Sequence, residues 1–352
     1  MAKVSTLNTP EKASSKLTPS QKAQSPIFHP NQITPDTFHR LLNCYPVTVE
    51  AIARRKATAR STRSSTAAAK KAKRSKPGPS SSSAGDGDEV LTEQEQADRD
   101  VREFLELDER RYRGLPEIVR DRADSDGGEG GYLTKEELIE VMEWKLKHGV
   151  SRPMLLGMIK RNTDDVVEKA TANAFAELLA PRRRLVNEFD GTSTEKGGAF
   201  PEFCLGMLSG PLRGVGPATS SLLLSVATAA RDAVEEVPFY SDDVFLWLCL
   251  GEVPVDGEEE SAKQKKENIR AGIFKPNGEI NVKYTVQEYR QLWDAVGKLR
   301  RRMNALGSPV SCMDVEKAAL VLRHVDVSGF FETEAEEGSS VGSKRKRNGK
   351  TS

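Results

Sequence analysis

The residues best suited to chemistry lie in a glycine-rich stretch near the middle of the chain, residues 208–224, which reads LSGPLRGVGPATSSLLL. Gly214 and Gly216 permit a tight turn whose backbone amides point outward without a Cβ in the way, and we expect a left-handed conformation at Gly216. Val215 anchors the turn inward, and Pro217 suits the first position of a following helix. Free amides at a helix start bind anions, aided by the helix dipole. The turn is therefore predicted to hold a nucleic-acid phosphate, a contact that positions the polymer without reading its sequence.

This stretch closely resembles the helix-hairpin-helix motif of the DNA glycosylase superfamily, whose hairpin reads L-x-G-h-G-x-x-T-A. The matching positions are Leu212, Gly214, Val215, Gly216 and Thr219, with Ser220 in the small-residue position. The resemblance implies a hairpin over residues 207–228 that binds the DNA backbone through Gly214, Val215, Gly216, Ala218 and Thr219. Two alternatives stay open. A glycine-rich turn between core helices has the same composition, and such hairpins also serve as protein-contact modules.

The resemblance continues downstream, where the chain reads VPFYSDDVFLW from residue 237. In the family an aspartate heads the next helix, and Asp242 falls in that place. The resemblance implies that Asp242 is catalytic, stabilising the cation formed when the base leaves or activating a water. In the ordinary alternative, Ser241 caps a helix whose first turn holds Asp242 and Asp243 because of the helix dipole. The neighbouring aromatic residues either stack on a flipped base or pack in the core; they are Phe239, Tyr240 and Trp247.

One departure from the family narrows the chemistry. Ala218 stands where bifunctional members carry a lysine that forms a Schiff base, so lyase chemistry by that route is excluded. The glycosylase resemblance covers residues 205–249. Residues 144–153 and 314–319 look like segments of a poorly characterised group of eukaryotic proteins with this hairpin, and that group implies no reaction.

No metal or cofactor is expected. The four cysteines lie far apart and form no CxxC pair, which disfavours a zinc ribbon, an iron–sulfur cluster and a disulfide framework. Asp124 and Asp126 match the first two ligands of a calcium loop, but Lys135 stands where the bidentate glutamate is required. That segment is therefore interpreted as a solvated turn.

The elements that must position these residues are predicted to be helices throughout. Helix starts are marked by a Ser or Thr with an acidic residue three positions later, at Thr92, Thr134, Thr285 and Ser311. Asn162 or Thr163 is expected to cap a further helix, and Gly149 and Pro153 to separate two others. No strand hairpin or repeat is evident. The prediction is an all-α, multi-helix globular domain over residues 90–335 that contains the hairpin.

A near-neutral net charge of +1 conceals a strong asymmetry. Residues 1–80 carry 15 Lys and Arg against three acids, and the last ten residues carry five basic groups and no acid, so residues 81–342 have a net charge of −16. Like-charged ends repel themselves and seek polyanions. Disordered basic tails are therefore predicted at residues 1–89 and 336–352. Within the first, a short amphipathic segment near 33–56 is expected to be broken into two pieces by Pro46.

Two compact basic clusters resemble nuclear localisation signals; they are Lys70, Lys71, Lys73, Arg74 and Lys76, and Lys344, Arg345, Lys346 and Arg347. They predict a nuclear protein and a nuclear import receptor as a partner. No apolar run reaches the roughly 18 residues of a membrane span, and the first residues lack the apolar core of a secretion signal.

Three functions follow from these patterns. The first is a nuclear DNA-associated protein that binds nucleic-acid backbone through the hairpin without sequence readout. The second is a monofunctional DNA base glycosylase using Asp242, and the third is a non-enzymatic module that binds a protein partner. The surroundings of Asp242 separate them, since a cleft that faces the hairpin favours catalysis and a sealed helix cap removes it.

Overall fold

The computed structural model describes residues 26–74, 92–125, 131–149, 152–179, 200–229, 236–251, 270, 272, 274–276 and 280–331. Within them the fold is all-α, as predicted, and the only β contact is an isolated bridge between Phe274 and Ile280. The helices are α2 (Pro35–Arg74), α3 (Glu93–Glu109), α4 (Leu115–Ser125), α5 (Lys135–His148), α6 (Pro153–Lys160), α7 (Asp164–Leu179), α9 (Glu202–Ser209), α10 (Pro217–Thr228), α11 (Asp242–Phe245), α13 (Val286–Ala305) and α14 (Cys312–Arg323). Shorter helical turns are η1 (Pro26–Phe28), η2 (Arg110–Gly114) and η4 (Leu246–Leu250). No helix in the described part of the chain is long and apolar enough to cross a membrane.

Local sequence signals set where several of these helices begin. Thr92, Thr134, Thr285 and Ser311 each form a reciprocal capping box with the acidic residue three positions later. Each box satisfies two backbone amides that the helix itself leaves without a partner. Gly149 follows the last residue of α5, and Pro153 opens α6. These predicted helix starts and this helix end are confirmed.

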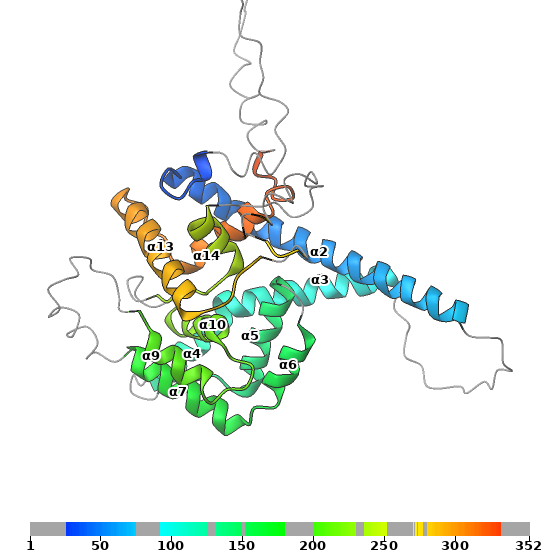
Figure 1. Cartoon of the computed structure of the whole chain (residues 1–352), viewed down its shortest axis with the longest axis horizontal. Coiled ribbons are helices and arrows are strands. Elements are labelled where there is room, and N and C mark those ends of the chain that lie inside the picture. The colour runs from blue at the N-terminus through cyan, green and yellow to red at the C-terminus, as the bar shows by residue number, and fades with distance from the viewer. Residues whose placement is uncertain are drawn as a thin grey trace, which may run out of the picture.

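Helix α10 lies at the centre of the body (Figure 1) and is buried from Ala218 to Thr228. Because its residues are buried on every face, other elements must cover it all round, and α10 packs against α4, α7, α9 and α13. Its hydroxyl groups bond both inside and outside the helix. Ser225 and Thr228 donate to the carbonyls of Leu222 and Leu224 at 2.8 and 3.0 Å, and Ser220 in the first turn donates to the Leu205 carbonyl of α9 at 3.3 Å. The first turn of α10, which follows the hairpin, is therefore held rigidly.

The N-terminal boundary of the folded body differs from the prediction. Helix α2 is one continuous helix of 40 residues with Pro46 inside it, so the expected break was wrong. Phe38, Leu41 and Val49 are fully buried in the core, and α2 packs against α3 and α14. Burial of this face outweighs the roughly 3 kcal/mol that a proline costs inside a helix. Residues 33–57 therefore belong to the domain and not to a disordered tail.

Helices α2 and α3 lie side by side and project together beyond the other helices (Figure 1). Two exposed ion pairs join them, Arg54 to Asp98 at 3.2 Å and Arg60 to Asp100 at 2.7 Å. Exposed pairs of this kind contribute about 1 kcal/mol or less each. The last turns of α2 carry Lys70, Lys71, Lys73 and Arg74. Of the predicted tails at residues 1–89 and 336–352, residues 1–25, 75–89 and 336–352 lie outside the described residues, and these include Lys76, Lys344, Arg345, Lys346 and Arg347.

Candidate functional site

The glycine-rich stretch forms a tight turn between α9 and α10, as predicted. Gly214 has φ 79°, and a Cβ there would lie 3.1 Å from the Cβ of Met158. Gly216 has φ −117° and ψ −175°, an extended conformation open to any residue, and a Cβ there would meet nothing within 4 Å. The expectation of a left-handed Gly216 was therefore wrong. Gly214 is needed for backbone conformation and close packing, whereas Gly216 leaves space open in front of α10.

Asn162, which lies between α6 and α7, holds the turn in place. The backbone amide of Arg213 donates to Asn162 Oδ1 at 2.8 Å, and Asn162 Nδ2 donates back to the Arg213 carbonyl at 3.1 Å. The Asn162 side chain is buried, and Leu212 and Val215 are buried beneath the turn. The sequence suggested Asn162 only as a helix cap. Its contact with the hairpin spans 51 residues, which no local pattern predicts.

Two backbone amides at the start of α10, those of Gly216 and Ala218, have no protein acceptor among the described residues. The amides of Thr219 and Ser220 instead donate to the Gly216 carbonyl at 2.9 and 2.8 Å. Because α10 has 12 residues, its dipole adds partial positive charge at this end. The turn therefore offers free donors where an anion can bind. The five residues predicted to contact the DNA backbone, Gly214, Val215, Gly216, Ala218 and Thr219, lie together there.

Asp242 is the first residue of α11, and two features fix its position. Ser241 caps the helix by accepting from the Asp243 amide at 3.3 Å, so the ordinary role expected of Ser241 is present. The hydroxyl of Tyr284 also donates to both carboxylate oxygens of Asp242, at 2.9 and 3.1 Å. Tyr284 is the one non-glycine residue of the described ranges with a positive φ, 56°. Such conformations cost about 1–3 kcal/mol and cluster at functional sites.

Opposing effects set the pKa of Asp242. Burial raises the pKa above its ordinary value, and this effect outweighs the Tyr284 hydrogen bond and the positive charges of Arg323, Lys145 and Arg152, which lower it. Asp242 is therefore less acidic than an exposed aspartate even though cations surround it. A partly desolvated carboxyl group with a specific hydrogen-bond partner is typical of catalytic groups.

The hairpin and Asp242 line the same cavity, which has a volume of about 500 Å³. That volume falls within the roughly 300–1,000 Å³ of small-molecule sites. Gly216 and Thr219 of the hairpin line the cavity wall, and so do Asp242 and Tyr284. Residues of α5 and α14 complete the wall. Asp242 therefore lines a cavity that it shares with the hairpin and is not sealed away inside a helix cap.

Lys145 of α5 also lines this cavity and was not identified from the sequence. Its Nζ donates to Thr219 Oγ1 in the first turn of α10 at 2.8 Å and lies 5.8 Å from the centre of the Phe239 ring. Burial lowers the pKa of Lys145 to about 8; the Asp242 charge opposes this shift and the Arg152 charge adds to it. The cavity therefore contains a desolvated amine as well as a carboxylate.

The aromatic residues near Asp242 divide between the core and the cavity wall. Trp247 is 2% exposed and donates its indole N–H to the carbonyl of Phe28, so the core interpretation holds for it. Tyr240 borders the cavity, but it is 1% exposed and its ring stacks on Tyr289. Phe239 is only partly buried and lines the cavity, with its ring edge-to-face against Trp144. Phe239 is therefore the ring best placed to contact a flat ligand.

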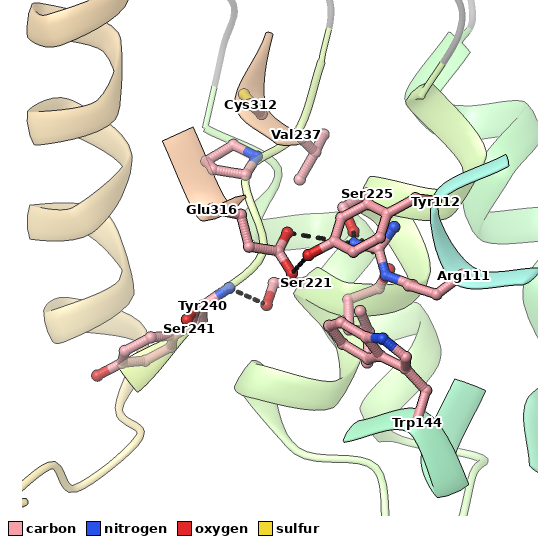
Figure 2. Close-up of polar contacts among 12 residues, drawn as sticks. Arg111, Tyr112, Trp144, Ser221, Ser225, Val237, Tyr240, Ser241, Cys312 and Glu316 are labelled. Carbon is pink, nitrogen blue, oxygen red and sulfur yellow. Dashed lines mark hydrogen bonds and ion pairs between the residues drawn. The ribbon is translucent and has the colours of Figure 1, made fainter. Parts of the chain in front are cut away.

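A buried ionic network supports the wall of the cavity (Figure 2). Arg111 is fully buried; its Nη2 donates to Ser225 Oγ at 2.7 Å and lies 3.4 Å from Glu316 Oε2. The Tyr112 hydroxyl donates to Glu316 Oε1 at 2.9 Å. Burial raises the pKa of Glu316, while the Arg111 charge and the Tyr112 hydrogen bond lower it. Because removing one partner of a buried pair costs about 3–5 kcal/mol, this network fixes η2, α10 and α14 relative to one another.

The described residues contain no cluster of three or more His, Cys, Asp or Glu side chains that could hold a metal ion. The four cysteines are free thiols, and Cys204 and Cys312 are buried. Residues 126–130, in the segment compared with a calcium loop, lie outside the described part of the chain. Asp124 itself lies in the last turn of α4.

Comparison with known proteins finds no relative: no protein-family model, no curated protein and no solved structure matches this chain.

Proposed function

We propose that this protein binds the nucleic-acid backbone through its hairpin and releases a base from a nucleotide held in the cavity, as a monofunctional DNA glycosylase does. The observation that carries the proposal is the shared cavity, whose wall contains both the hairpin turn and Asp242. A phosphate bound at the start of α10 places the adjoining nucleotide at this cavity. Enzymes that act on a base must take it out of the stack, and the cavity offers the extruded base a site.

Asp242 supplies the chemistry in this proposal. Positive charge develops on the sugar as the glycosidic bond breaks, and a fixed carboxylate stabilises that charge without having to reorganise. Tyr284 holds both carboxylate oxygens and so sets their direction. Phe239 on the cavity wall offers an aromatic face to the base. Ala218 leaves the hairpin helix without an amine, which fits a monofunctional reaction at Asp242.

The charge distribution supports a nucleic acid as the polymer that is bound. Residues 81–342 have a net charge of −16, whereas both ends of the chain are basic. The basic ends are therefore proposed to supply much of the affinity, with the strong salt dependence that counterion release produces. The same basic clusters support nuclear localisation through an import receptor. Four residues of the first cluster lie on α2, which projects from the body (Figure 1).

The experiment that tests the reaction compares Asp242→Asn with Asp243→Asn. Both residues lie in the first turn of α11 and carry the same charge, but Tyr284 bonds to Asp242, whereas Asp243 lies 3.8 Å from Arg323. Duplexes containing uracil, alkylated or oxidised bases are scored for abasic sites. We expect Asp242→Asn to bind duplex normally and to lose base release by about 10²–10³-fold, as the loss of one electrostatic stabiliser does. Asp243→Asn should remain active.

Three outcomes would contradict this proposal in different ways. Wild type that binds every duplex and releases no base would leave a backbone-binding protein without this reaction. Wild type that binds no duplex would favour the protein-interaction module. Equal activity in both variants would reduce Asp242 to a residue of the helix start, where its loss costs about 0.3–1 kcal/mol of stability and changes no chemistry.

A further inference from the structure

We infer that Lys145 is an amine nucleophile that condenses with the aldehyde of an abasic nucleotide held in the cavity. The inference rests on the proposed function, because that aldehyde is what base release leaves behind. It adds an amine step after base release, which the monofunctional reaction assigned to Asp242 does not itself include. Lys145 Nζ lies 2.8 Å from Thr219 Oγ1 at the start of α10, and Lys145 lines the cavity together with Asp242. A sugar held beside Asp242 and a phosphate held at the hairpin would thus share the cavity with this amine. Lys145 belongs to α5 and not to the hairpin helix, where Ala218 stands.

The surroundings of Lys145 differ from those of a structural lysine. Among the described residues its one hydrogen bond is to a hydroxyl, and it forms no ion pair with a carboxylate within 4 Å. Buried cations are normally paired. Lys147, two residues along the same helix, is an ordinary case, since it pairs with Glu103 at 3.5 Å. An amine that is buried and yet left without a carboxylate partner suits a reactive group better than a stabilising one.

The same surroundings keep part of this amine neutral near physiological pH. Burial lowers the pKa of Lys145 to about 8, whereas the pKa of an exposed lysine is about 10.4. Asp242 raises the pKa and Arg152 lowers it. The other charged or titratable groups of the wall come from several elements; they are Lys56, Tyr112, His148, Tyr240, Asp243, Tyr284, Glu316, Arg323 and His324. Only the neutral amine carries the lone pair that attacks a carbonyl.

The condensation needs no oxidant, reductant or bound cofactor. The neutral Lys145 amine attacks C1′ of the ring-opened sugar, so that an N–C1′ bond forms and the carbonyl electron pair moves to oxygen. Proton transfer from nitrogen to oxygen gives a carbinolamine. A further proton on that oxygen lets it leave as water and yields a protonated Schiff base. Water added back to C1′ restores the aldehyde and the free lysine.

The test supplies the aldehyde ready-made, so it does not depend on base release. The full-length protein is incubated with a duplex that contains one abasic site, and sodium borohydride then reduces any Schiff base to a stable secondary amine. Covalent complexes are separated by denaturing electrophoresis, and peptide mass spectrometry locates the modified residue. The variants are Lys145→Met, of similar length without the amine, Lys145→Arg, which retains the charge, and Lys147→Met as the matched control on α5.

We expect wild type and Lys147→Met to form the complex on Lys145, and both Lys145 variants to lose at least nine-tenths of it. The trapping rate of wild type should rise with pH and level off above about pH 8, where the amine is already neutral. Three results would overturn the inference: no complex with wild type, undiminished complex with Lys145→Arg, or DNA attached only to lysines of the basic ends. A wild type that traps abasic DNA but releases no base would count against the proposed glycosylase alone, and the reverse result would count against Lys145 alone.

Discussion

The two glycines of the hairpin should respond in opposite ways to the same small change. At position 214 an alanine would have to adopt φ 79°, which L-residues rarely do. Its Cβ would lie 3.1 Å from Met158 Cβ and 3.4 Å from Ile159 Cδ1. The left-handed conformation costs roughly 1–2 kcal/mol, and overpacking costs roughly 1–3 kcal/mol. Because Met158 is 43% exposed, that edge of α6 can shift, so we expect Gly214→Ala to lose about 2–4 kcal/mol of unfolding free energy.

Gly216→Ala should leave stability intact or improve it slightly. Its extended backbone accepts alanine, and no atom lies within 4 Å of the new Cβ. Replacing glycine with alanine at a compatible site reduces the entropy of the unfolded chain, which stabilises the folded protein by about 0.4–1 kcal/mol. The Cβ instead occupies the space in front of the free amides, so DNA binding should weaken. Gly216→Glu should weaken binding further, because it places a carboxylate where a phosphate would bind.

Urea unfolding followed by helical circular dichroism measures the stability of each variant, and fluorescence anisotropy with a labelled duplex measures its DNA binding. Gly214→Ala is assayed for binding below its unfolding transition. Equal destabilisation by both alanine variants would refute the assignment of Gly214 as the packed position. A folded Gly216→Glu variant that binds duplex as tightly as wild type would refute the phosphate site at the start of α10.

Three further predictions concern Tyr284, the buried start of α2 and the first basic cluster. Tyr284→Phe removes a hydrogen bond that lowers the pKa of Asp242, so the ionised carboxylate should be lost at a higher pH on acidification. The acid limb of the pH profile of kcat/KM should therefore move to higher pH. An unchanged acid limb would mean that Asp242 is not the group whose protonation stops the reaction. Deleting residues 1–80 should unfold the protein, since it removes buried Phe38 and Leu41, and large-to-small changes at such sites cost about 2–5 kcal/mol each. Replacing Lys70, Lys71, Lys73, Arg74 and Lys76 with alanine should preserve the circular dichroism spectrum and flatten the salt dependence of DNA binding, by about 0.9 in log–log slope per lost phosphate contact; an unchanged slope would assign the affinity to the hairpin alone.

The local features of the fold could be predicted from the sequence. The capping boxes at Thr92, Thr134, Thr285 and Ser311 involve groups only three residues apart, so their residue types suffice to place a helix start. The hairpin turn is equally local, because glycine frees the backbone and proline restricts it at their own positions. Even there the assignment of the left-handed conformation to Gly216 was wrong. Gly214 takes it instead, and the close approach of α6 to Gly214 is a tertiary contact that the local pattern does not show.

Helix α2 shows where local reasoning fails. Pro46 and the basic composition of residues 1–80 both argue against a folded segment. Phe38, Leu41 and Val49 nevertheless bury completely, because α2 packs against α3 and α14. Most of the stability of a helix comes from such packing and not from propensity. The apolar spacing was visible in the sequence, but the surface that covers it was not.

The reactive surroundings of the cavity were decided only by tertiary structure. Asp242 could be named from its place after the hairpin, but its partner Tyr284 lies 42 residues away. Lys145 meets Thr219 across 74 residues, and Arg111 meets Glu316 across 205. Local rules relate side chains no more than about four residues apart along a helix, so nothing in the spacing distinguishes Lys145 from Lys147. Burial separates them, because the packing of α5 against its neighbours removes one amine from water and leaves the other beside Glu103.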